Sequence, residues 1–135
     1  MFYMAGYSTK PLIDKLGIKK GQTVYFRDAP EEFFAELGPL PNGVFTAKKL
    51  NRPVDFMHCF YTERKKLEDD LIKFQQYLEV SGMLWISWPK KASKVKTDIT
   101  ENTLRAVLLP LNLVDIKVSA ITDVWSGLKF VWRKR

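Results

Sequence analysis

Hydrophobic residues follow two different patterns along the chain, one typical of buried strands and one typical of a helix face. The order in which these patterns alternate constrains the possible fold more than any other feature. Short apolar runs predict buried strands, most clearly at 55–61 and 83–88. Between them, over 62–80, one apolar helical face is formed by Leu67, Leu71, Phe74 and Leu78. A strand–helix–strand unit implies a right-handed crossover and parallel pairing. Near-continuous apolar strands are typical of a parallel sheet that is covered on both faces.

Weaker signals complete the order of elements. Strands are predicted at 23–27 and, less strongly, at 44–47, and a short helix at 30–37 lies between them. Ser81 and Gly82 are expected to end the helix at 62–80, and Pro110 to end or kink a helix whose apolar stripe is Leu104, Val107, Leu108 and Leu111. With a leading helix, the expected order is helix, strand, helix, strand, strand, helix, strand, helix, strand, strand.

The chain closes with two strand-like segments, 114–121 and 128–132, and no helix fits between them. They are joined only by 122–127, so they should be antiparallel neighbours, with Gly127 supplying the turn. The predicted fold is α/β and Rossmann-like. It has a mostly parallel mixed sheet with an antiparallel C-terminal strand and helices on both faces.

This layout resembles the class I methyltransferase fold over residues 10 to 133, because that family also ends with an antiparallel strand inserted beside its neighbour. The chain is also similar to a small bacterial family known only as a domain of unknown function. The shared motifs are Gly6–Ser8, Lys15–Lys19, Gly38–Pro41, Trp88–Lys90, Thr97–Asp98 and Trp125–Leu128. The resemblance implies one methyltransferase-like domain over 1–135, with no established activity.

Composition limits the class of protein further. The chain has 135 residues, which is one domain's worth, and 46% of them are hydrophobic and 27% charged, as in soluble globular proteins. No apolar stretch is long enough to span a membrane, so no membrane partner is expected. The single cysteine, Cys59, precludes an internal disulfide and is typical of a reducing compartment, so we expect a cytoplasmic protein. The oligomeric state is not indicated.

The methyltransferase resemblance raises S-adenosylmethionine as a cofactor, but the residues depart from the family pattern. Those enzymes have a glycine-rich loop after the first strand, whereas 27–33 contains no glycine and includes Pro30. They also have an acid after the second strand, where this chain has Lys48 and Lys49, and a strand–helix unit is missing between 47 and 55. If the cofactor binds at all, the predicted positions are Asp28, Tyr61 and Thr62. For Asp28, with Glu31 three residues on, a helix cap is the favoured interpretation, although the residue lies where a cofactor would bind.

A basic loop at 88–98 is the strongest candidate for a ligand site. It contains Trp88, Lys90, Lys91, Lys94 and Asp98, on a chain with a net charge of +7. Lysines neutralise phosphates and an indole stacks on bases, so the loop suggests an anionic small molecule or a nucleic acid. The plain alternative is a solvated loop with Trp88 packed in the core.

Two residues, one at the end of this loop and one outside it, each have two possible roles. Asp98, with Glu101 three residues later, is expected to cap the following helix rather than act on a ligand. Trp125 could wall a pocket or cap the core.

No catalytic set emerges from the sequence. His58 is the only histidine and, like Cys59, lies in an apolar strand, so both are expected in the core. No Cys/His cluster exists for zinc, and no metal is predicted. Three hypotheses remain: a non-catalytic binding module for an anion, which is preferred; a methyltransferase with an atypical cofactor loop; and a basic nucleic-acid-binding protein.

Overall fold

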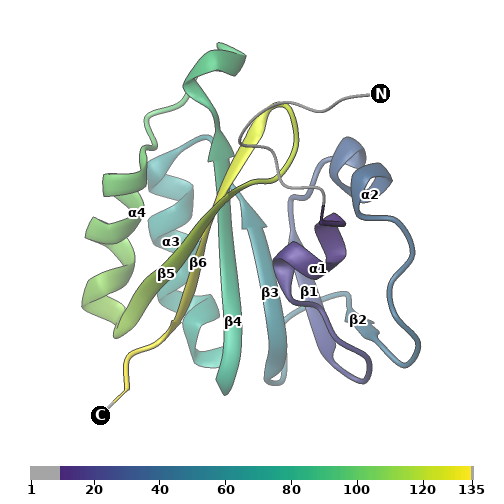
Figure 1. The fold of residues 1–135 in the computed structure, drawn as a ribbon. Coiled ribbons are helices and arrows are strands. Elements are labelled where there is room, and N and C mark those ends of the chain that lie inside the picture. The colour runs from purple at the N-terminus through teal and green to yellow at the C-terminus, as the bar shows by residue number, and fades with distance from the viewer. Residues whose placement is uncertain (1–9, 135) are drawn as a thin grey trace, which may run out of the picture.

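The computed structural model describes residues 10–134, so the Gly6–Ser8 motif lies outside the described residues. The structure is a six-stranded sheet with helices on both faces (Figure 1). Its elements are α1 (Leu12–Leu16), β1 (Thr23–Arg27), α2 (Glu31–Leu37), β2 (Phe45–Ala47), β3 (Val54–Phe60), α3 (Arg64–Phe74), β4 (Leu78–Pro89), α4 (Glu101–Leu108), β5 (Leu113–Ala120) and β6 (Trp125–Trp132). The predicted order of helices and strands is therefore confirmed.

The strand order across the sheet is β2-β1-β3-β4-β6-β5. The first four strands pair in parallel, and β6 inserts antiparallel between β4 and β5. This is the Rossmann-like mixed sheet with an antiparallel close that the hydrophobic pattern predicts. Residues 48–53 form neither a helix nor a strand, so they add no strand beyond β2. β2 is therefore an edge strand of the sheet.

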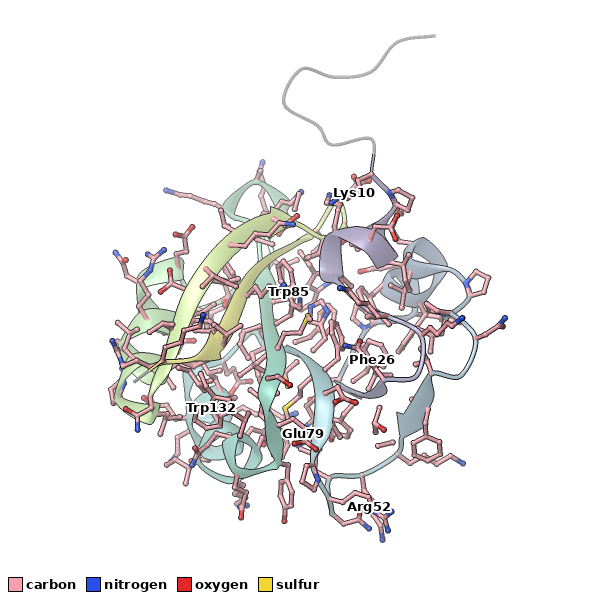
Figure 2. All side chains as sticks on the ribbon, turned by 60° about the horizontal axis from the view of Figure 1, so that its bottom comes forward. Lys10, Phe26, Arg52, Glu79, Trp85 and Trp132 are labelled. Atoms are coloured by element: carbon pink, nitrogen blue, oxygen red, sulfur yellow. The ribbon has the colours of Figure 1, made fainter. Side chains whose placement is uncertain are left out.

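Each face of the sheet has its own apolar core, because successive strand residues point to opposite faces. On one face α1 and α2 pack through Leu16 and Phe33 around Trp85. Trp85 lies in the interior (Figure 2), and its Nε1 donates to the carbonyl of Leu16 at 2.9 Å. On the other face α3 and α4 pack against Met57 and Cys59 through an apolar stripe made of Leu67, Leu71, Leu104 and Leu108.

The start of β4 differs from the prediction. The helix expected to reach residue 80 ends at Phe74 and is followed by a single 3₁₀ turn, and Leu78 already pairs with Val54 in the sheet. Leu78 falls at the spacing of the apolar face of α3, but it is buried as the first residue of β4 and not as part of the helix. Gly82 lies inside β4 at an irregularity of register, where an added Cβ would come within 2.9 Å of the Glu79 carbonyl oxygen. Gly82 is therefore needed for close packing and does not stop a helix.

Gly127 also has a different role from the one predicted. It lies within β6, paired with Ser87 and Ser119, and it is not among the glycines with positive φ. A Cβ at this position would lie 2.8 Å from the Ile121 side chain and 3.1 Å from the Trp85 ring. The prediction of a turn glycine is wrong, because what the position requires is space for these two side chains.

Among residues 10–134, no helix has both the length and the apolar character needed to cross a membrane.

Candidate functional site

The carboxyl ends of β1, β3 and β4 meet at one edge of the sheet, the upper edge in Figure 1. Ligands of open α/β sheets bind beyond this edge. The loops that follow the three strands approach one another here, and the turn between β5 and β6 lies beside them because Lys90 N donates to the Val124 carbonyl at 2.7 Å. Any site that resembles those of other α/β domains should therefore lie at this edge.

Asp28, which follows β1 directly, has a left-handed backbone with φ of 56°. It does not cap α2, whose N-cap is Pro30 without a side-chain hydrogen bond, so the cap prediction for Asp28 is wrong. Its carboxylate instead pairs with Lys66 of α3. Asp and Asn tolerate the left-handed region better than most residues, which is why this turn forms without glycine.

A second set of contacts joins the same strand ends to α3. Arg27 Nε donates to Asp70 Oδ2 at 3.0 Å, and the Tyr61 hydroxyl donates to the same oxygen at 2.8 Å. Tyr61 is only 2% exposed, and burial raises the pKa of its hydroxyl, so it stays a neutral donor. The guanidinium of Arg27 also lies 5.4 Å from the centre of the Phe74 ring. These contacts hold β1, β3 and α3 together.

The residues at this place do not match the cofactor site that the methyltransferase resemblance implies. Asp28 and Tyr61 are held by Lys66 and Asp70, and the Thr62 carbonyl accepts from the Thr97 hydroxyl at 2.6 Å. Two lysines and no acid directly follow β2. Three cavities among residues 10–134 are lined by other residues, and Asp28, Tyr61 and Thr62 line none of these three.

The structure does not bring together the side chains predicted from the 88–98 loop. Trp88 is only 8% exposed and packs in the core beneath α3 and α4. The interpretation of Trp88 as a core residue is therefore confirmed, and stacking on a ligand is excluded. Trp125 lies on the opposite face, with its ring edge-on to Phe60 at 5.3 Å and its Nε1 3.3 Å from a Glu32 oxygen. Both tryptophans contribute to packing, and strand alternation separates them.

The polar residues of the loop are also dispersed. Asp98 accepts from the Arg64 amide at 2.7 Å, so it satisfies the first turn of α3. The prediction that Asp98 caps α4 is therefore wrong. The N-cap of α4 is Thr100, which forms a capping box with Thr103. Lys91 and Lys94 are exposed on a 3₁₀ turn, and neither lines one of the three cavities.

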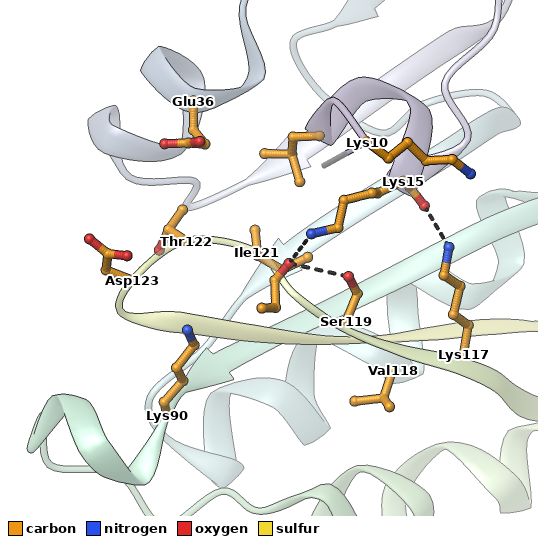
Figure 3. A pocket seen from close by; sticks show the side chains of 12 residues that line it. Lys10, Lys15, Glu36, Lys90, Lys117, Val118, Ser119, Ile121, Thr122 and Asp123 are labelled. Carbon is orange, nitrogen blue, oxygen red and sulfur yellow. Dashed lines mark hydrogen bonds between the residues drawn. The ribbon is translucent and has the colours of Figure 1, made fainter. Parts of the chain in front are cut away.

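Lys90 alone of these lysines lines a cavity of about 610 Å³, between α1, α2 and the β5–β6 hairpin (Figure 3). We call it the lysine cavity. Its charged lining residues are Lys10, Lys15, Lys90, Lys117, Glu36 and Asp123. Ser119 and Thr122 add hydroxyls. The excess of lysines over acids favours an anion.

Backbone contacts hold two of these lysines in place. Lys15 Nζ donates to the Ala120 carbonyl at 3.1 Å, and Lys117 Nζ donates to the Lys15 carbonyl at 3.3 Å (Figure 3). Each ammonium has three N–H donors, so one hydrogen bond to a carbonyl leaves donors for a ligand. The sequence prediction missed Lys15 and Lys117, because they lie about a hundred positions apart and form no local run.

His58 and Cys59 are fully buried, as predicted. His58 Nε2 lies 2.7 Å from Ser87 Oγ, and Nδ1 has no hydrogen-bond partner among the residues that the structure describes. Burial lowers the pKa of His58 to about 3 and raises that of the Cys59 thiol, so neither side chain is charged at neutral pH. Over residues 10–134, no group of three or more His, Cys, Asp or Glu side chains could hold a metal ion.

The fold is similar to that of several solved methyltransferases. A SAM-dependent methyltransferase from Aquifex aeolicus aligns with a TM-score of 0.61 and 15% identity, over 88% of this chain and 86% of that one. Aeropyrum pernix fibrillarin with natively bound S-adenosylmethionine gives 0.58 and 13%, over 86% and 69%. A ribosomal protein L11 methylase from Lactobacillus delbrueckii subsp. bulgaricus gives 0.56 and 11%, over 91% and 76%.

At these identities the likeness establishes the fold and not the activity. The predicted methyltransferase-like fold is confirmed. No family model matches the chain, and no curated protein matches it in sequence.

Proposed function

We propose that this chain is a binding domain for a phosphate-bearing anion, built on the methyltransferase fold and acting without catalysis. The lysine cavity carries the proposal. Lys90, which directly follows β4 at the edge of the sheet where such folds bind ligands, lines it together with Lys15 and Lys117. Its volume of about 610 Å³ is within the range of small-molecule sites, about 300–1,000 Å³.

The charge distribution supports an anionic ligand over a neutral one. Ion pairs among residues 10–134 engage the cations of β1, α3 and α4, namely Arg27, Arg64, Lys65, Lys66 and Arg105. None of these pairs involves Lys15, Lys90 or Lys117. Lysines that are not neutralised around a recess raise the local concentration of anions, because low-dielectric walls focus their field.

Calorimetric titration with pyrophosphate at low salt tests the proposal. The wild-type protein should bind it, and Lys15→Gln, Lys90→Gln and Lys117→Gln should each weaken binding by about tenfold, the loss expected for one charge-assisted hydrogen bond. Lys91→Gln is the matched control, because Lys91 is the next residue but does not line the cavity. No binding, or equal losses in the Lys91 and Lys90 variants, would remove the lysine cavity as the site.

A second candidate is an S-adenosylmethionine-dependent methyltransferase with an atypical cofactor loop. The solved structures with bound cofactor support it, and Asp28 keeps a left-handed turn directly after β1. On this proposal Asp28, Tyr61 and Thr62 would contact the cofactor, and the Asp28–Lys66 pair would have to open. Saturable binding of S-adenosylhomocysteine that is lost in Tyr61→Phe, but not in Lys90→Gln, would establish this candidate and displace the first.

A further inference from the structure

Two lysines lie directly opposite each other on the last hairpin. Lys117 of β5 and Lys129 of β6 are register partners, so their side chains leave the same face of the sheet. Like charges in that position are destabilising. Burial lowers the pKa of Lys129, and the charges of Lys117 and Lys19 lower it further.

Three lysines that form no ion pair among residues 10–134 lie on or beside the α1 side of the sheet. Lys117 lines the lysine cavity, Lys129 lies opposite it, and a Cβ at Gly17, the C-cap of α1, would be 3.7 Å from Lys129 Nζ. Lys19 follows two residues after Gly17 and lies close enough to affect Lys129. We call Lys117, Lys129 and Lys19 the lysine row.

No carboxylate of the described residues compensates this row. The ion pairs among residues 10–134 involve neither Lys117, Lys129 nor Lys19. Asp115, the acid nearest to Lys117 along β5, is occupied by Arg105 of α4, at 3.1 Å. The fold therefore keeps an uncompensated repulsion, which a ligand with several negative charges would relieve.

We propose that the ligand of the lysine cavity is a single-stranded nucleic acid, with one phosphate in the cavity and the next ones along the lysine row. This inference rests on the proposed function and names its substrate class. The cavity volume of about 610 Å³ is within the range of small-molecule sites, and Lys117, which lines the cavity, is also the register partner of Lys129 in the row.

A single strand fits this surface better than a membrane does. Lys15 and Lys117 are tied to backbone carbonyls inside a recess, where a flexible strand can place a phosphate but a flat headgroup layer cannot. Membrane binding at basic surfaces usually adds inserted aromatic side chains. The large apolar residues exposed on β5 are only Ile116 and Val118.

The test is the salt dependence of binding to a fluorescent oligothymidylate, measured by anisotropy. The wild type should bind it more tightly than thymidine monophosphate, and log K should fall linearly with log salt between about 50 and 200 mM. The double variant Lys19→Gln/Lys129→Gln should lose affinity for the oligonucleotide and reduce the slope by about 0.7 for each lysine. Binding of thymidine monophosphate should be unchanged, because neither residue lines the cavity.

The matched control is Lys65→Gln/Lys73→Gln, which removes the same charge from α3, on the other face of the sheet. If both double variants lose affinity equally, net charge and not the lysine row causes binding, and the inference fails. It also fails if the oligonucleotide binds no more tightly than the mononucleotide, or if phosphatidylserine vesicles bind through the row and the oligonucleotide does not. The proposed function survives the first two outcomes as long as pyrophosphate binding depends on Lys90.

Discussion

Lys66 of α3 forms an ion pair with Asp28, the residue directly after β1, and so joins the first turn of α3 to the strand end where a cofactor would approach. Asp28 combines this pair with a left-handed backbone. The residue therefore stabilises a turn that, in the family this fold resembles, a glycine would form.

The backbone at Asp28 gives the first prediction. A left-handed conformation costs about 1–2 kcal/mol for a residue with a Cβ, so Asp28→Gly should be more stable than Asp28→Ala by about 1 kcal/mol. Both variants lose the pair with Lys66, so their difference isolates the backbone. Urea denaturation measures it. An alanine variant as stable as the glycine variant would contradict the left-handed turn.

Asp70 is predicted to be a structural residue. Asp70→Asn should reduce the free energy of unfolding by about 2–3 kcal/mol, because Arg27 and Tyr61 would lose a charged acceptor in a half-buried site. Asp69→Asn is the control on the preceding residue, and should cost less than about 1 kcal/mol because its pair with Lys65 is exposed. Equal losses in the two variants would show that the Asp70 cluster adds nothing beyond a surface pair.

Gly127 should not tolerate a methyl group. Gly127→Ala brings a Cβ within 2.8 Å of the Ile121 side chain and should cost about 1–3 kcal/mol through overpacking. Adding Ile121→Val, which removes one of the two clashing atoms, should recover part of the loss. If the double variant is as unstable as the sum of the single ones, the clash is not the cause.

His58 makes stability depend on pH. Its pKa is about 3 in the fold and 6.5 when exposed, so between these values the unfolded chain binds a proton that the folded chain does not. The free energy of unfolding should therefore fall as the pH falls, by about 2 kcal/mol from pH 7 to pH 5. His58→Gln should lose this contribution and show a flatter profile in denaturant titrations at the two pH values. A variant profile parallel to that of the wild type would assign the pH dependence to other groups.

The order of elements was predictable because hydrophobic periodicity reports burial directly. The antiparallel close followed from the short connection between β5 and β6. The start of β4 was not predictable, because Leu78 is buried in a strand yet continues the spacing of α3.

The site was less predictable than the fold. Trp88 lies in an apolar run in which both faces are buried, so the sequence could not show which face it occupies. Lys15, Lys117 and Lys129 come together only through the topology of the sheet. Lys90 was found because it belongs to a local run, although its neighbours Lys91 and Lys94 do not share its cavity.

The most direct test of the central claim, that the ligand site is the lysine cavity, is a thermal unfolding series with pyrophosphate and with S-adenosylhomocysteine. A ligand at a hundred times its Kd stabilises the fold by about 2.7 kcal/mol, which is readily measured as a rise in Tm. We expect pyrophosphate to raise the Tm of Lys91→Gln as much as that of the wild type and the Tm of Lys90→Gln clearly less, and S-adenosylhomocysteine to raise none. A rise with S-adenosylhomocysteine, and none with pyrophosphate, would contradict the account.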